Sequence, residues 1–142
     1  MMEKITNPTV YDCNIIVLGK SNEEKGNLTV VENYNTVPFD VKRIFYLYDI
    51  PGDAARGSHA HRNLYQLMIA AGGSFDVIID DGNVKRSVTL NRPYYGLLVM
   101  PGIWCELVNF SSGSICLVLA SEKYDENDYI DDYEKFIQYK IK

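Results

Sequence analysis

The stretch Phe75–Leu90, which reads FDVIIDDGNVKRSVTL, predicts a β-hairpin and with it an all-β fold. Every second position from Phe75 to Ile79 is apolar, which is the period of a strand with one buried face. The pair Asp81-Gly82 that follows is a strong signal for a two-residue hairpin turn, whose central residues take positive φ. The run Val84–Leu90 has the length and composition of a second strand and completes the hairpin.

Further runs of strand length lie on both sides of this hairpin, each rich in β-branched or aromatic residues. Turn signals such as Gly72-Gly73 and Pro101-Gly102 separate them. Because no helical period interrupts the runs, about nine strands are expected to form an antiparallel sandwich or barrel. The predicted strands are Ile15–Leu18, Leu28–Glu32, Val41–Tyr48, Leu64–Ala71, Phe75–Asp80, Val84–Leu90, Tyr95–Val99, Trp104–Asn109 and Ile115–Ser121.

The last segment has a different period. Asp125 can cap a helix, and apolar residues then recur at intervals of three or four from Tyr129 to Ile137. We expect one amphipathic C-terminal α-helix over about 126–141, packed on the sheet. A chain of 142 residues is long enough for one core, so we expect a single domain over 1–142 with its barrel over about 14–121.

The amino-acid composition of the chain argues against several classes of protein. A net charge of −5 lacks the basic field of a nucleic-acid-binding protein, although a few local arginines can still hold a small anion. Residues 1–10 lack the apolar run of a signal peptide, and no stretch approaches 18 apolar residues, so no membrane partner is expected. The three cysteines are an odd number at unrelated spacings, which favours reduced thiols in a cytoplasmic protein.

The only two histidines of the chain stand one residue apart, in His59-Ala60-His61. In an extended strand, side chains at i and i+2 project from the same face, so both imidazoles face one volume. Imidazole is suited both to proton transfer near neutral pH and to metal binding. The pair therefore predicts one of these two chemistries.

The neighbouring residues resemble the two motifs of the cupin family of small β-barrels. Gln66 and Gly73 follow the His pair at the spacing of the first motif, although Gln66 stands where a metal-binding cupin has Glu. In the second motif, Pro101-Gly102 is followed by Cys105 where the last histidine ligand is expected. A neutral amide and a thiol are poor partners for iron or manganese, so we predict no metal. Zinc on the two histidines and Cys105 is the chemically conceivable alternative.

A closer resemblance is to the nucleotide-sugar 3,4-ketoisomerases, which are metal-independent cupins that act on dTDP-4-keto-6-deoxyglucose. Segments spread over residues 42–128 carry it, notably Arg56–His61 and Ala120–Asp125. The resemblance implies a cupin-type antiparallel β-barrel or jelly roll, no cofactor, and a homodimer that exchanges an N-terminal strand. It also implies a partner sugar aminotransferase in deoxy amino sugar biosynthesis. Phe45 departs from the family, in which many members have a tyrosine there.

We expect His59 and His61 to be catalytic. Moving a ketone from C4 to C3 passes through an enediol or enediolate, and one imidazole can take the C3 proton and return it to C4 while the other orients it or hydrogen-bonds the oxygen. The candidate substrate-binding residues donate hydrogen bonds to the enediolate oxygen, bind the pyrophosphate or line the ligand. They are Gln66, Arg56 and Tyr46 for the oxygen, Arg43 and Arg56 for the pyrophosphate, Trp104 for stacking, and Cys105 as a thiol or a small buried residue.

Two other functions fit the same residues. A non-catalytic cupin that binds a nucleotide sugar is favoured by Phe45 and Cys105, and a metal-dependent cupin oxygenase by the His pair. The residues leave open which histidine is the base and whether the product has the gluco or the galacto configuration.

Overall fold

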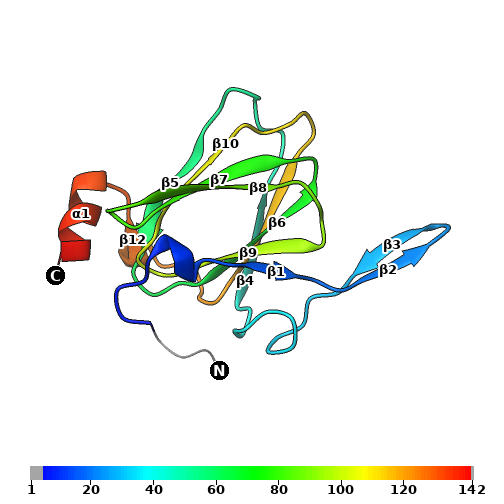
Figure 1. The fold of residues 1–142 in the computed structure, drawn as a ribbon, viewed down its shortest axis with the longest axis horizontal. Helices are drawn as coiled ribbons and strands as arrows, with labels where there is room; N and C mark the ends of the chain where they lie inside the picture. The colour runs from blue at the N-terminus through cyan, green and yellow to red at the C-terminus, as the bar shows by residue number, and fades with distance from the viewer. Residues whose placement is uncertain (1–4, 142) are drawn as a thin grey trace.

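The computed structural model describes residues 5–141, which form two facing five-stranded antiparallel sheets with one C-terminal α-helix (Figure 1). One sheet has the order β1-β9-β6-β11-β4 and the other β12-β5-β10-β7-β8. This arrangement confirms the predicted all-β class. The strands are β1 (Ile15–Val17), β2 (Lys20–Glu23), β3 (Gly26–Thr29), β4 (Arg43–Leu47), β5 (Arg56–His61), β6 (Gln66–Gly72), β7 (Phe75–Asp80), β8 (Lys85–Leu90), β9 (Tyr95–Val99), β10 (Trp104–Val108), β11 (Ile115–Ala120) and β12 (Tyr129–Ile130).

The predicted hairpin is present as β7 and β8, with Phe75 opposite Leu90 and Asp80 opposite Lys85. Its tight turn lies one residue later than predicted, because the Asp81 N–H bonds the Val84 carbonyl and leaves Gly82 and Asn83 as the central pair. Gly82 has a φ of 93°, as the first central residue of this kind of turn requires. The Asp81 carboxylate accepts N–H groups of Asn83 and Val84, both at 2.9 Å.

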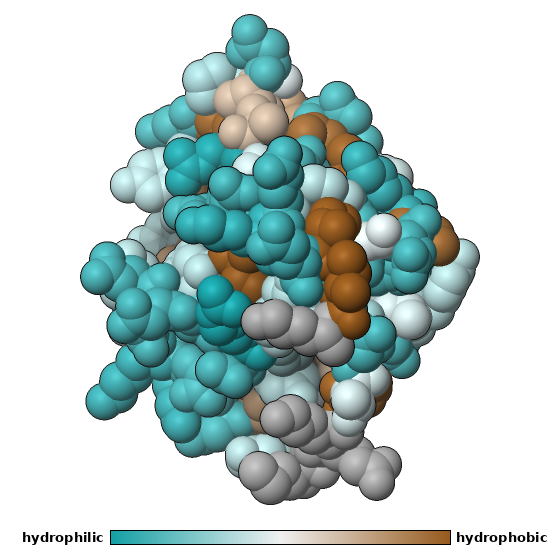
Figure 2. Space-filling view, turned by 90° about the vertical axis from the view of Figure 1, so that its left-hand side faces the viewer, coloured by the Kyte–Doolittle hydropathy of each residue, from teal (hydrophilic) through white to brown (hydrophobic). Residues whose placement is uncertain are grey.

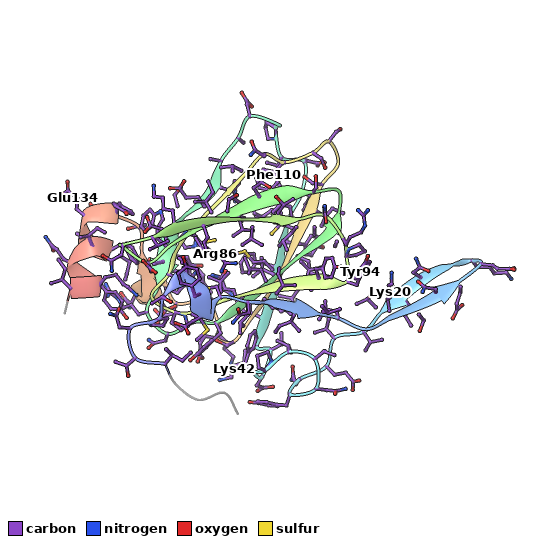
Figure 3. The ribbon with its side chains drawn as sticks, viewed as in Figure 1. Lys20, Lys42, Arg86, Tyr94, Phe110 and Glu134 are labelled. Carbon is purple, nitrogen blue, oxygen red and sulfur yellow. The ribbon has the colours of Figure 1, made fainter. Side chains whose placement is uncertain are left out.

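The same hairpin fastens the N-terminal segment to the barrel. The Asp81 carboxylate also accepts the Val10 N–H at 2.9 Å, in the short 3-10 helix η1 (Val10–Asp12). Arg86 on β8, labelled in Figure 3, donates to the carbonyls of Val10 and Cys13 at 2.9 and 3.3 Å. Side chains of the hairpin therefore hold the chain just before β1.

The faces of β4 follow the predicted alternation. Arg43, Phe45 and Leu47 are half-buried on the inner face, whereas Ile44 and Tyr46 are 58% and 57% exposed on the outer one. Their cross-strand partners on β11 extend the inner face through small or apolar residues. The core thus lies between the two sheets.

The C-terminal segment differs from the single helix predicted over about 126–141. Asp125 does cap a helix, but this is the 3-10 helix η2 (Glu126–Asp128), which is followed by strand β12. The α-helix α1 begins only at Tyr133 and ends at Ile141. Strand pairing overrides the helical period here because Tyr129 and Ile130 bond opposite His61 and Ala60.

Hairpin β2–β3 extends away from the barrel, and every side chain of β2 is exposed (Figure 1). The predicted strand Leu28–Glu32 is displaced to Gly26–Thr29, and its partner strand was not predicted. At its base, the Lys20 ammonium lies 3.9 Å from the centre of the Tyr94 ring (Figure 3). The opposite end of the molecule, beside α1, is mostly hydrophilic (Figure 2).

Two further expectations concern the whole chain. The predicted single domain includes residues 1–4 and 142, which lie outside the described residues. Within residues 5–141, no helix is long and apolar enough to cross a membrane.

Candidate active site

His59 and His61 share the inner face of β5, as their spacing predicts. Their ring centres are 5.0 Å apart and their planes nearly perpendicular. Ala60 between them points to the outer face, where it is buried with Trp104 and Phe136. His59 is half-buried, while His61 is only 4% exposed. The pair therefore presents one accessible imidazole and one enclosed imidazole to the same space.

Asp128 of η2 holds the enclosed imidazole. Its carboxylate lies 3.0 Å from His61 Nδ1, and both side chains are buried. The other carboxylate oxygen accepts the Asn63 N–H at 2.7 Å. Because a carboxylate only accepts, it places the proton of neutral His61 on Nδ1 and leaves Nε2 with its lone pair. The arrangement fixes both the orientation and the tautomer of His61.

Burial keeps both imidazoles neutral near pH 7. Burial lowers the pKa of His59 below its usual value, against the opposing effects of the Gly57 carbonyl and Asp131. Burial, and then the charge of His59, lower the pKa of His61 to about 4, against the opposing effect of Asp128. Uncharged imidazoles can accept a proton, so the site is suited to general-base chemistry.

A bulge in β5 sets the position of His59. The pairing with β10 shifts by one residue between Cys105, opposite His59, and Glu106, opposite Gly57. Gly57 and Ser58 both have positive φ, 91° and 50°. A Cβ atom on Gly57 would lie 2.9 Å from the Cys105 carbonyl oxygen, so only glycine fits.

Tyr129 on β12 closes one side of the histidine pair. Its ring centre lies 4.9 Å from that of His59 and 4.3 Å from that of His61. Tyr129 pairs directly with His61 across the β5–β12 ladder. The phenol ring therefore forms a wall against which both imidazoles pack.

The opposite sheet contributes Arg43 and Gln66 to the inner face. Ala120 on β11 is the cross-strand partner of both, so the two longer side chains flank a small residue in one row. Gln66 is 4% exposed, and Arg43 is half-buried. The Gln66 amide and the Arg43 guanidinium therefore lie on the inner face of one sheet, and the histidines lie on the other sheet, which faces it.

Cys105 also faces this interior, directly across the ladder from His59. Burial raises the pKa of its thiol far above the usual value, so the thiol stays protonated. All three cysteines are free and buried. Cys105 therefore occupies the site as a small buried residue, which was one of the two predicted roles.

Three predicted site residues lie elsewhere. Tyr46 is on the outer face of β4, beside Tyr48 with ring centres 5.8 Å apart. Trp104 is on the outer face of β10, where it packs on Phe136 and donates its indole N–H to Glu106 at 3.1 Å. Arg56 is exposed at the start of β5. Strand alternation places Tyr46 and Trp104 on the outer faces of their sheets, away from the histidines.

No set of three or more His, Cys, Asp or Glu side chains in residues 5–141 is arranged to hold a metal ion. A large surface groove, of about 830 Å³, is lined by residues such as Arg62, Tyr65 and Tyr139. Neither histidine lines this groove, so the chemistry of the inner face rather than groove size identifies the candidate site.

Asp128 and Tyr129 were not predicted as site residues. Both were assigned to the C-terminal helix, where a carboxylate in the first turn is explained by the helix dipole. The apolar spacing of three or four residues runs through Tyr129 and Ile130 into the helix, so no local pattern marks the short strand that follows Asp128. Asp128 is 67 residues away from His61 in the chain, so the contact leaves no local trace in the sequence.

Comparison with known proteins gives one consistent result. Residues 11–141 match the protein family described as FdtA: WxcM-like, C-terminal. The chain is 42% identical over 125 residues to the TDP-4-oxo-6-deoxy-alpha-D-glucose-3,4-oxoisomerase of Aneurinibacillus thermoaerophilus, covering 88% of this chain and 90% of that protein.

Two solved structures are similar over almost their whole length. A 3,4-ketoisomerase from Helicobacter canadensis has a TM-score of 0.90 and 41% identity, covering 92% of this chain and 98% of that one. QdtA, a sugar 3,4-ketoisomerase from Thermoanaerobacterium thermosaccharolyticum solved in complex with TDP, has a TM-score of 0.91 and 35% identity, covering 93% and 96%.

Proposed function

The chain belongs to the FdtA (WxcM-like, C-terminal) family, and from this premise we propose that it is a metal-independent dTDP-sugar 3,4-ketoisomerase. Its substrate in this proposal is dTDP-4-keto-6-deoxyglucose, and its product is the corresponding 3-keto sugar. One observation carries the proposal: two neutral imidazoles face a single interior space, and one of them is anchored by a buried carboxylate.

His59 is the base in this mechanism because it is the more accessible imidazole of the pair. It takes the proton from C3, and the electron pair of that C–H bond forms the C3–C4 double bond while O4 becomes negatively charged. The O3 hydroxyl proton passes to O4, and the charge moves to O3. As O3 becomes the ketone, protonated His59 returns its proton to C4, so no atom or electron is lost.

His61 orients this exchange. Asp128 fixes its tautomer, so its Nε2 is an acceptor that can hold the substrate hydroxyl or steady His59 in the perpendicular arrangement observed. Gln66 is a buried amide on the facing sheet that can donate to the charged oxygen. Enclosure between the sheets strengthens both hydrogen bonds because the local dielectric constant is low.

Metal independence is supported by the donors that surround the histidines. Gln66 offers a neutral amide, and the Cys105 thiol stays protonated. Neither compensates the charge of a divalent ion. We expect purified protein to turn over after exhaustive chelation, with less than about 0.1 metal ion per chain by elemental analysis, whereas stoichiometric iron with activity lost on chelation would favour the oxygenase alternative.

The decisive experiment is incubation with dTDP-4-keto-6-deoxyglucose in deuterated water, followed by NMR of the sugar. An isomerase that uses His59 as described accumulates the 3-keto product, and it incorporates deuterium at C4 to the extent that the proton on His59 exchanges with solvent before it returns. Absence of both exchange and product would favour a nucleotide-sugar-binding protein, an alternative for which Phe45 on the inner face is the specific observation. The configuration at C4 of the product identifies the face from which the proton returns.

We also propose a homodimer, with the product passed to a sugar aminotransferase in the cytoplasm. Strands β2 and β3 form a separate two-stranded sheet, in which Leu28 is 60% exposed, and Val17 at the end of the preceding strand β1 is 68% exposed. Such apolar side chains favour contact with a second copy. Sedimentation should give twice the chain mass, and Leu28→Asp should shift the distribution toward monomer. A monomeric wild-type protein would contradict the dimer without affecting the isomerase proposal.

A further inference from the structure

Arg43 carries an edge of its guanidinium that has no partner among residues 5–141. The Nε and Nη2 atoms are both buried, and neither has a hydrogen bond. No carboxylate lies within ion-pair distance of Arg43 in this part of the chain, whereas the neighbouring Lys42 pairs with Glu122 at 3.6 Å. A buried guanidinium that lacks acceptors is costly, so this edge is suited to a bound group.

Aromatic rings hold the guanidinium in place. Its central carbon lies 5.2 Å from the Phe45 ring centre and 5.5 Å from that of Tyr124. These rings can attract a cation, but they do not accept the two in-plane N–H bonds. The guanidinium is therefore oriented without being hydrogen-bonded along the Nε–Nη2 edge.

The geometry of the unpaired Nε–Nη2 edge of Arg43 indicates which chemical groups can bind to it. Nε–H and one Nη2–H point the same way, roughly parallel, and form a fork that matches two neighbouring oxygens carrying shared negative charge. A carboxylate or a phosphate fits this fork. An enediolate fits it as well, because its vicinal oxygens O3 and O4 carry the negative charge in turn as the proton passes between them.

The position of Arg43 favours the sugar end of the substrate. Arg43 and Gln66 flank Ala120 on the inner face of the sheet opposite the histidines. The charge of Arg43 also contributes, as the smallest of several causes, to lowering the pKa of His61. Phe45, on the same strand face, offers no hydroxyl, so the fork is the strongest oxygen-binding donor on that strand.

We propose that Arg43 is a catalytic residue that binds O3 and O4 of the enediolate through its Nε–Nη2 edge. This inference rests on the proposed function and replaces the sequence-based expectation that Arg43 binds the pyrophosphate. Since the fork contacts both oxygens throughout, it stabilises the charge before and after the proton passes from O3 to O4.

The test compares Arg43→Gln and Arg43→Lys with wild type in kcat at saturating substrate and in affinity for TDP by calorimetry. We expect Arg43→Gln to lower kcat by about 10²–10³-fold while the Kd for TDP changes less than about threefold. Arg43→Lys keeps the charge but loses the fork, so its kcat should fall nearly as far. The matched control is Arg92→Gln, an exposed arginine in the β8–β9 turn, which should retain wild-type kcat.

Melting temperatures separate a catalytic loss from a folding defect. Because Arg43→Gln removes an unpartnered buried cation, its melting temperature should equal or exceed that of wild type. A tenfold or greater weakening of TDP binding with kcat retained would instead assign Arg43 to the pyrophosphate and overturn the inference, as would full activity of Arg43→Gln. Failure of wild type to turn over would contradict the proposed function itself, which these variants do not test.

Discussion

The two faces of the sheet formed by β5 and β10 carry adjacent residues with different tasks. His59, His61 and Cys105 point inward, while Ala60 and Trp104, their immediate neighbours in the chain, point outward beneath α1. The inner face holds polar groups that need a ligand or each other, and the outer face forms a second apolar cluster. Adjacent residues of the same strand therefore serve two purposes: those on the inner face form the candidate site, and those on the outer face stabilise the fold.

The largest expected effect is on the inner face. His59→Asn and His61→Asn should each lower kcat by about 10²–10⁴-fold, because asparagine at position 59 cannot exchange a proton near pH 7 and asparagine at position 61 does not present the Nε2 acceptor of an oriented imidazole. The melting temperature of His59→Asn should stay close to that of wild type, whereas His61→Asn should melt lower because it loses the buried hydrogen bond to Asp128. Steady-state kinetics and thermal unfolding check both statements, and full turnover by both variants would contradict the assignment of the pair.

The next effect belongs to the outer face. Trp104→Ala should destabilise the protein by about 3–5 kcal/mol, since the indole packs against Tyr133 and Phe136 and is 6% exposed. Below its melting temperature, the variant should keep kcat. Urea unfolding measures the first quantity and saturating kinetics the second. A Trp104→Ala protein of normal stability that lost TDP binding would restore the predicted stacking role.

Asp128→Asn tests the contact that joins the inner face to the C-terminal segment. A hydrogen bond to a charged group contributes about 1.5–3 kcal/mol, so kcat should fall by roughly 10- to 100-fold. The amide can also present its N–H to Nδ1 and select the other tautomer of His61. An unchanged kcat would mean that Asp128 only secures η2, and Asp125→Asn, which alters the exposed cap of η2, serves as the matched control.

The smallest expected effect is a shift of the pH–activity profile toward lower pH. Both histidines have lowered pKa values, and the base must be neutral, so activity should persist as the pH falls through the usual imidazole value of 6.5. The acid limb of kcat/KM is therefore expected below 6.5. A limb at or above 6.5 would show that neither buried imidazole is the free-enzyme base.

The features that could be predicted depend on residues close together in the chain, such as strand periodicity and turn residues. The period-2 alternation of Phe75–Ile79 and the turn residues predicted a hairpin whose register depends on neighbours in the chain. The same period placed His59 and His61 on one face. It could also have excluded Trp104, because Cys105 already occupied the inner position of β10. Trp104 was predicted as a site residue only because of the motif spacing.

The all-β class, the shared face of the two histidines, and the presence of Gln66 and Cys105 where a metal-binding cupin has Glu and His follow from the amino-acid sequence, because they depend on side-chain type and strand period. Only the tertiary structure decided that Asp128 anchors His61 and that Arg43 keeps a free fork beside Gln66. Those contacts join strands distant in the chain, and their energies come from burial and pairing across the barrel, which no local pattern encodes.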